Sequence, residues 1–229
     1  MNKYLIALFV LLFFFNNASY AGSCGGDRDI NTCKANATQG NTSAQYNLAV
    51  MYHRGDNVSK NIKQALYWYR EAAKQGLGQA QYNLGLMYSS GDGVPQSNQT
   101  AAAWYNQAAK QGVVEAQYNL AVLYANGDGI TKNEQKAGRW YFSAAQQGLA
   151  DAQFELGLIY LQGIGVDKDV VKAHMFFSIA SEGGNNKAVV AKNALSIYMS
   201  AEEVSKSESL RKTSWRIRKR SKATKTWEK

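Results

Sequence analysis

Apolar residues recur along most of the chain at the spacing of an amphipathic helix. In one segment Ala44, Leu48 and Tyr52 follow one another at four-residue intervals and form a narrow stripe. In the segment after it, small and aromatic residues share one face, namely Ala65, Trp68, Tyr69, Ala72 and Ala73. The pattern predicts two consecutive helices, in which alanines allow close approach and aromatic rings fill the remaining space.

This pair of segments is repeated. Blocks resembling residues 44–48 begin again at Ala80, Ala116 and Ala152, so the period is 36 residues. Because one helical hairpin cannot bury both of its faces, we expect the copies to stack on one another. The sequence therefore predicts an all-α fold, specifically a right-handed α/α superhelical solenoid of helix-turn-helix repeats.

Glycines mark the ends of the predicted helices, where a positive φ angle reverses the chain. Shortly after the first helix, three copies carry a glycine at the position that Asn57 occupies in the first copy. Asn tolerates the left-handed region well, so we predict a positive φ at Asn57. The glycines that end the second helices are Gly76, Gly112, Gly148 and Gly184.

Both ends of the array are predicted to be caps. Residues 29–39 fit the register of a second helix. After the fourth repeat, Lys192 stands at the position that corresponds to Leu48 in the repeats. Ser200 and Glu203 form a capping box that begins a last helix, expected to run to about Arg216. The apolar stripe expected before it is Ala188, Ala191, Leu195 and Tyr198. The predicted segments are a signal peptide (1–21), an N-terminal half-repeat cap (22–39), repeats at 40–75, 76–111, 112–147 and 148–184, C-terminal capping helices (185–216) and a basic tail (217–229).

The repeat resembles the Sel-one-like repeat family, a relative of the tetratricopeptide repeats. The second copy carries the pattern in Ala80, Leu84, Gly85, Tyr88, Gly91, Gly93, Val94, Ala101, Trp104, Tyr105, Ala108, Ala109 and Gly112. The resemblance covers residues 40–184 and implies an adaptor that binds other proteins. Some exported members carry a Cys pair in every repeat, and this chain lacks those pairs.

Alignment with tetratricopeptide units implies a peptide track along the first helices. Rigid Tyr rings offer contact area and Asn amides can bind the backbone of an extended peptide. Alternatively, the Tyr residues pack between helices, the Asn residues bond across repeats, and the track does not exist. Gln45 and its copies are expected to pack or to form hydrogen bonds between repeats. The predicted peptide-binding residues are Tyr46, Asn47, Tyr82, Asn83, Tyr118, Asn119 and Glu155, with Phe154 beside the last.

The first residues predict export. Lys3 precedes an apolar run from Tyr4 to Phe15, and small residues stand at Ser19 and Ala21. The run is shorter than the roughly 20 residues that a stable membrane anchor needs. We predict a signal peptide cleaved after Ala21 and a periplasmic or secreted protein, because the leader pattern favours export over a buried core helix. A lipoprotein anchored through Cys24 stays open, because residues 21–24 resemble a lipobox without its usual Leu.

Export affects the interpretation of the two cysteines. In an oxidising compartment we expect Cys24 and Cys33 to form a disulfide that ties the N-terminus to the first helix. A reactive thiol is the alternative, although only Arg28 and Lys34 are near in sequence to lower its pKa.

The net charge of +9 lies almost entirely in the C-terminal segment. Residues 206–229 carry a net charge of +8, whereas residues 22–205 are neutral. Outside the cytosol such a tail would meet an anionic membrane or envelope surface, and nucleic acid is not an expected partner. A solvated tail without a partner is the alternative. The residues expected to contact the anionic surface are Arg216, Arg218, Lys219, Arg220 and Lys222.

Candidate chemistry is sparse. A cell-wall or β-lactam-associated hydrolase is the alternative function, because some exported relatives are linked to penicillin binding. A Ser-x-x-Lys match runs from Ser209 to Lys212, but no Ser-Asp-Asn or Lys-Thr-Gly accompanies it. His53 and His174 are expected to be isolated surface or groove residues. We predict a binding protein with no catalytic residues, cofactor or metal site.

Overall fold

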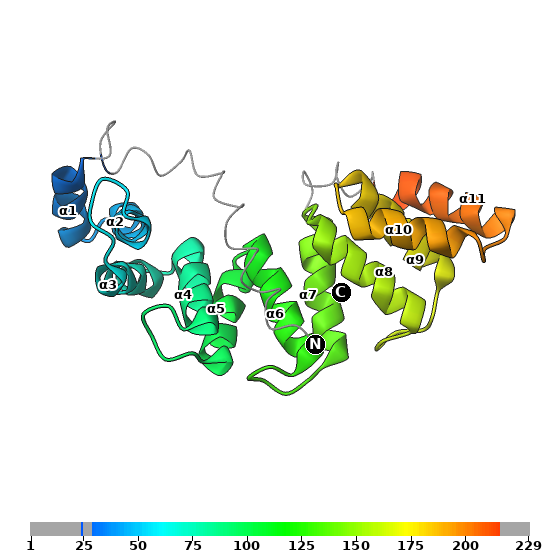
Figure 1. Ribbon diagram of the computed structural model, residues 1–229, viewed down its shortest axis with the longest axis horizontal. Coiled ribbons are helices and arrows are strands. Elements are labelled where there is room, and N and C mark those ends of the chain that lie inside the picture. The colour runs from blue at the N-terminus through cyan, green and yellow to red at the C-terminus, as the bar shows by residue number, and fades with distance from the viewer. Residues whose placement is uncertain (1–23, 25–28, 216–229) are drawn as a thin grey trace, which may run out of the picture. The chain divides into compact units, whose positions relative to one another are not determined.

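The computed structural model describes Cys24 and residues 29–215 of the 229-residue chain. These residues form eleven α-helices and one π-helical turn, Arg211–Trp215, and they contain no strand (Figure 1). The helices are α1 (Ile30–Thr38), α2 (Thr42–Arg54), α3 (Ile62–Lys74), α4 (Gly78–Ser90), α5 (Asn98–Lys110), α6 (Val114–Asn126), α7 (Glu134–Gln146), α8 (Ala150–Gln162), α9 (Val170–Glu182), α10 (Asn186–Ser196) and α11 (Ala201–Leu210).

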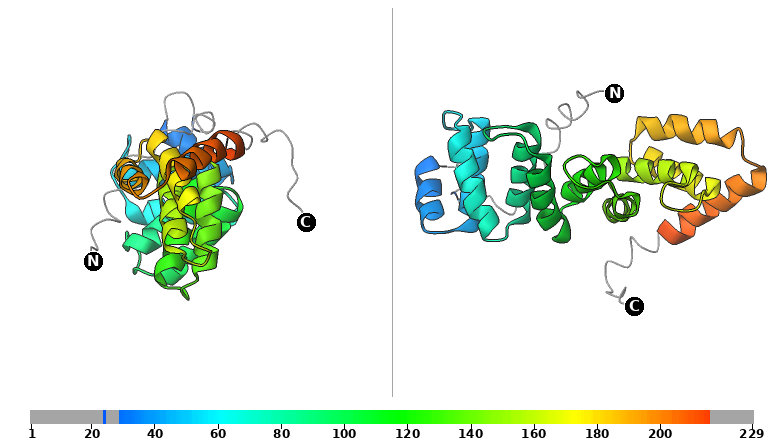
Figure 2. Two further views of the ribbon diagram at one scale, coloured as in Figure 1. Left: turned by 90° about the vertical axis from the view of Figure 1, so that its right-hand side faces the viewer. Right: turned by 90° about the horizontal axis from the view of Figure 1, so that it is seen from below.

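The chain divides into two compact units, residues 1–116 and 117–229. In the first unit each helix from α1 to α4 packs against the next one along the chain, and in the second unit α7 packs on α8 and α8 on α9. Two further views show these successive helices within each unit (Figure 2). The stacking of consecutive helices confirms the predicted all-α solenoid class.

An aromatic pair at equivalent positions joins the two helices of every hairpin. The ring centroids of Tyr46 on α2 and Tyr69 on α3 are 5.9 Å apart. The pairs in the other hairpins have centroid distances between 5.6 and 5.9 Å and are Tyr82–Tyr105, Tyr118–Tyr141 and Phe154–Phe177. The first-helix ring of each repeat thus packs against the second helix of the same hairpin.

The angle between the two ring planes varies with the residue that lies three positions after the first-helix aromatic residue. Where that residue is Ala49 or Ala121, the two rings are inclined at 55° and 62°. Where it is Gly85 or Gly157, the angles are 37° and 40°. A Cβ atom on Gly85 would lie 2.4 Å from the ring of Tyr105, so the missing methyl group lets the ring approach the helix.

The turns follow the glycine pattern. Asn57 has a φ of 58°, which confirms the prediction of a left-handed residue. Gly76 has a φ of 88° and directly follows Gln75, the C-cap residue of α3. The amide of Leu77 donates to the carbonyl of Ala72, which closes a Schellman motif.

The N-terminal cap consists of α1. This helix ends before Gly40, whose φ of 89° matches that of Gly76 one period later. Cys24 and Cys33 form a disulfide, and both residues are buried. The bond joins the segment before α1 to that helix.

The C-terminal cap differs from the predicted stripe. Ala188 is buried, but Ala191 and Leu195 are only half-buried and Tyr198 is 86% exposed. Tyr198 lies beyond the end of α10, so it no longer continues the helical register. The predicted capping box at Ser200 is present, and α11 ends at Leu210 before the π-helical turn rather than continuing as an α-helix to Arg216.

Candidate protein-binding surface

The residues predicted to form a peptide track do not all reach the surface. Tyr46 is 6% exposed and Asn83 is 5% exposed, and the Asn83 amide donates to the Tyr46 hydroxyl over 3.5 Å. The predicted peptide track is therefore interrupted in the first unit, because these two side chains are packed in the interior. The half-buried members of the predicted set are Asn47, Tyr82, Tyr118, Asn119 and Glu155.

Buried glutamines connect the helices of neighbouring repeats. The side-chain amide of Gln45 on α2 donates to the carbonyl of Ala37 on α1, and its oxygen accepts from Gln75 at the end of α3. In the next repeat Gln81 makes the same contacts with Ala73 and Gln111. The expectation that this column forms hydrogen bonds between repeats is confirmed.

The fourth repeat lacks one member of this network. Gly183 occupies the position that Gln75, Gln111 and Gln147 hold in the earlier repeats. The amide of Gln153 still donates to the Ala145 carbonyl, but its buried oxygen has no hydrogen-bond partner within the described residues. The glutamine that precedes three of the four second-helix glycines was the sequence signal for this network, and our sequence reasoning missed it.

The second unit contains a cavity of about 180 Å³. Residues of α6, α7 and α8 and of the segments that follow α6 and α8 line it. Its apolar lining includes Leu158, Ile159 and Ile164, and its polar lining includes Tyr141 and Glu155. One predicted site residue, Glu155, thus faces a hollow that the sequence did not indicate.

The electrostatics of this cavity centre on Glu155. Burial raises the pKa of its carboxyl group above the ordinary value, Lys187 opposes that effect and Asp151 adds to it. Burial also raises the pKa of the Tyr118 and Tyr141 hydroxyls, and the negative charge of Glu155 raises both further. The carboxylate of Glu155 therefore acts electrostatically on both phenols.

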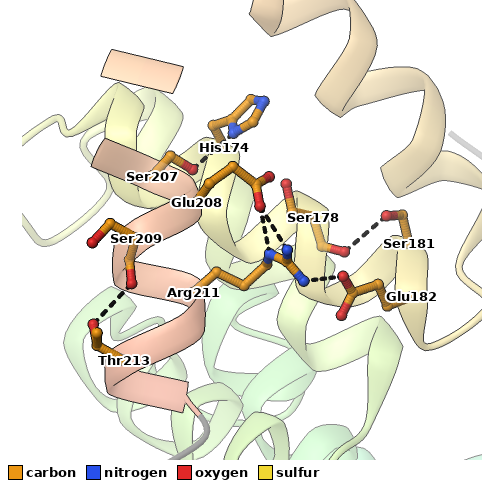
Figure 3. Close-up of polar contacts among 9 residues, drawn as sticks. All are labelled: His174, Ser178, Ser181, Glu182, Ser207, Glu208, Ser209, Arg211 and Thr213. Atoms are coloured by element: carbon orange, nitrogen blue, oxygen red, sulfur yellow. Dashed lines mark hydrogen bonds and ion pairs between the residues drawn. The ribbon is translucent and has the colours of Figure 1, made fainter. Parts of the chain in front are cut away.

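His174 is buried, which corrects the expectation of a surface or groove histidine. The residue is 3% exposed because α10 and α11 both pack against α9. The Ser196 hydroxyl donates to the Lys192 carbonyl, so it accepts from His174 Nε2 over 2.9 Å. His174 Nδ1 then accepts from the Ser207 hydroxyl over 2.8 Å (Figure 3). Burial lowers the pKa of His174 and Lys192 contributes, whereas Glu208 opposes the shift.

Arg211, the residue that follows α11, also holds this last helix to α9. Arg211 binds Glu208, with 2.9 Å from Nε to the carboxylate, and its Nη1 contacts Glu182 on α9 (Figure 3). These charge-assisted contacts and the His174–Ser207 hydrogen bond make α11 an integral cap of the second unit.

His53 is also not isolated, contrary to expectation. Its Nε2 lies 2.9 Å from a carboxylate oxygen of Asp92, which belongs to the turn after α4. The hydroxyl of Tyr69 lies 3.5 Å from the other ring nitrogen. Stacking brings the end of α2 close to the turn after α4. Asp92 recurs as Asp56 and Asp128, but no other repeat has a histidine at the position of His53, so the repeat pattern does not signal the pair.

The serine of the Ser-x-x-Lys match gives no support to the hydrolase alternative. Ser209 and Lys212 are both exposed on the last helical segment. The Ser209 main-chain carbonyl accepts from the Thr213 hydroxyl over 2.8 Å (Figure 3). The cavity of the second unit has neither residue in its lining.

Metal-ligating clusters and membrane-spanning helices are both absent from the described part of the chain. It contains no group of three or more His, Cys, Asp or Glu residues placed to hold a metal ion. None of its helices combines the length and the apolar character needed to cross a bilayer. The predicted signal peptide and the basic residues Arg216 to Lys222 lie outside the described residues.

The consecutive helical hairpins define an α/α repeat protein. A family model for the Sel1 repeat matches four consecutive segments, 42–77, 78–113, 114–149 and 150–185. Since these segments cover more than half of the chain, the protein belongs to the Sel1 repeat family, as the resemblance predicted. Sel1 repeat proteins are typically non-catalytic scaffolds that bind other proteins.

Solved structures agree with this assignment. A protective antigen present in uropathogenic Escherichia coli strains, which displays an SLR fold, is 33% identical with a TM-score of 0.73. The alignment covers 91% of this chain and 47% of that one, so the chain spans about half the length of the relative. A Sel1 repeat protein from Oxalobacter formigenes is 34% identical with a TM-score of 0.69, covering 73% of this chain and 70% of that one. A search of curated proteins finds no match.

Proposed function

We propose that the protein is an exported scaffold that binds another protein or a peptide through the first helices of its repeats. The observation that carries the proposal is the set of partly exposed residues Tyr118, Asn119 and Glu155 on α6 and α8, the last of which lines a cavity. Aromatic rings and amides of this kind provide contact area and backbone hydrogen bonds.

The test is a crosslinking pull-down from an envelope extract. The variant Asn47→Ala/Asn119→Ala removes one half-buried track amide from each unit, and we expect it to lose partners that the wild-type protein captures. Asn193→Ala is the matched control, because Asn193 is exposed on α10. An identical set of captured proteins for all three chains would refute the proposed binding surface.

We further propose that the mature protein begins at Gly22 and resides in the periplasm or outside the cell. The disulfide between Cys24 and Cys33 supports this location, because such bonds persist in oxidising compartments. It also favours the cleaved form over the lipoprotein, since a bonded Cys24 has no thiol to carry a lipid. The mass of the envelope protein distinguishes the forms, and a cytosolic protein that retains Met1 would contradict export.

For the basic tail we propose contact with an anionic envelope surface. Each basic group near such a surface contributes about 1 kcal/mol, and salt weakens the attraction. A chain that ends at Trp215 keeps Ser207 and Arg211, which hold α11 to α9. We expect this truncation to lose binding to phosphatidylglycerol vesicles, whereas equal binding by the full chain and the truncation would exclude the role.

A further inference from the structure

Glu155 is an unusual member of its column. The three earlier repeats carry a neutral Asn at this position, namely Asn47, Asn83 and Asn119. Only the fourth repeat therefore places a carboxylate there, and Glu155 is half-buried and lines the cavity of the second unit. A half-buried carboxylate is costly unless a cation or hydrogen-bond donor compensates for its lost hydration.

The nearby cations leave this compensation incomplete. Lys132 lines the cavity too, but its ammonium lies 2.9 Å from Glu134, with which it forms an ion pair. Lys187 is an exposed residue of α10 that influences Glu155 without lining the cavity. Asp151 adds a second negative charge in the vicinity. The charge distribution at the cavity therefore favours a cationic occupant over an anionic one.

The walls of the cavity specify the rest of the occupant. Leu158, Ile159 and Ile164 offer aliphatic surface, and the volume of about 180 Å³ far exceeds the roughly 10–15 Å³ that one water needs. A side chain with an aliphatic stem and a charged tip would bury the stem against these residues and place the tip at the carboxylate. A purely apolar side chain would desolvate Glu155 without pairing it.

We propose that this cavity receives a lysine side chain of the bound protein or peptide, with its ammonium paired to Glu155. This inference rests on the proposed scaffold function and specifies the chemistry of its ligand. Because the other repeats have Asn in place of Glu155, the chain has one such site rather than one per repeat.

The test is an NMR titration of the chain comprising residues 22–229. The probes are acetyl-Ala-Lys-Ala-amide and the matched peptide with norleucine, which keeps the aliphatic stem and lacks the ammonium. We expect the lysine peptide to shift the methyl resonances of Ile159 and Ile164 with a stoichiometry of one. The norleucine peptide should bind about tenfold more weakly, as expected for loss of a hydrogen bond to a charged group.

Two variants distinguish the specific effect of the Glu155 carboxylate on binding from the effect of the net charge of the protein. Glu155→Gln should reduce binding of the lysine peptide by about tenfold, to the level of the norleucine peptide. Glu202→Gln removes the same charge from an exposed position on α11 and should leave the affinity unchanged. Amide spectra of both variants report whether the fold is retained.

The cavity assignment and the scaffold function can fail separately. Equal binding of the two peptides, no shift of the Ile159 and Ile164 methyl groups, or full affinity in Glu155→Gln would overturn the cavity assignment. The scaffold function would survive that result if Asn47→Ala/Asn119→Ala still lost its partners in the pull-down.

Discussion

A single methyl group distinguishes two of the four hairpins from the other two. Gly85 and Gly157 allow a second-helix ring to approach, whereas Ala49 and Ala121 hold the equivalent ring at a steeper angle. Gly138 on α7 is different, because a Cβ added there would meet no atom within 4 Å. The same substitution is therefore expected to have opposite effects at two helical glycines.

We predict that Gly85→Ala lowers the free energy of unfolding by about 1–2 kcal/mol, because overpacking against Tyr105 outweighs the gain in helix propensity. Gly138→Ala should raise it by about 0.5–1 kcal/mol. Urea denaturation of both variants measures the changes. Stabilisation by Gly85→Ala would show that the ring moves aside at no cost.

The buried histidine predicts a dependence of stability on pH. Burial lowers the pKa of His174 below its ordinary value of about 6.5, so the unfolded chain binds a proton that the folded chain resists. The stabilisation is present above about pH 6.5, the ordinary value, and is lost as the pH falls below it through the lowered pKa of the folded state. Unfolding at pH 7 and pH 5 should therefore show a loss of stability on acidification.

His174→Gln should make this loss smaller, although Gln costs stability at pH 7 by disturbing the hydrogen bonds with Ser196 and Ser207. His53→Gln is the control, since His53 is the other histidine in the chain, and the loss should persist in it. An unchanged loss in His174→Gln would assign the titration to another group.

At the scale of elements, helices are joined by amides as well as by apolar packing. Gln81 connects α3 with the end of α5, whereas Gln153 makes only one of the two equivalent hydrogen bonds. The difference arises from Gly183, which has no side chain to donate.

We predict that Gln81→Leu lowers the free energy of unfolding by about 2–3 kcal/mol, because it leaves the Ala73 carbonyl and the Gln111 amide without this partner. Gln153→Leu should cost about 1 kcal/mol or less, since it also removes an unsatisfied buried oxygen. Thermal unfolding of the two variants tests the contrast. Equal losses would mean that the hydrogen bonds contribute little.

At the scale of the whole molecule, stability in a repeat array is a sum over neighbours. The disulfide between Cys24 and Cys33 joins α1 to the segment before it, and α1 packs on α2. Its removal should therefore act mainly on the N-terminal cap and reach distant repeats only weakly.

We predict that Cys24→Ser/Cys33→Ser destabilises the cap by about 2–3 kcal/mol, because the bond closes a short loop in the unfolded chain. Hydrogen exchange should accelerate in α1 and α2 and stay close to wild type in α8 and α9. Uniform acceleration in all helices would contradict nearest-neighbour stability.

The repeating features could be predicted because they depend on local contacts. Asn57 and Gly76 stand where the backbone needs a positive φ, and the residue types reveal it. The position of a side chain in a column did not determine its exposure, however. Tyr46 and Asn83 are buried, whereas Asn119 and Glu155 are half-buried. Burial depends on the neighbouring helices, which differ between repeats.

The amino-acid sequence by itself determined the helical period, the positions of the turns and the family, because each depends on residues that recur every 36 positions. Only the tertiary structure decided what the non-repeating residues do. His174 forms a hydrogen bond with Ser207, which lies 33 residues further along the chain. Glu155 lines a cavity to which residues of three helices contribute. Such contacts arise from the packing of distant segments, so no local pattern specifies them.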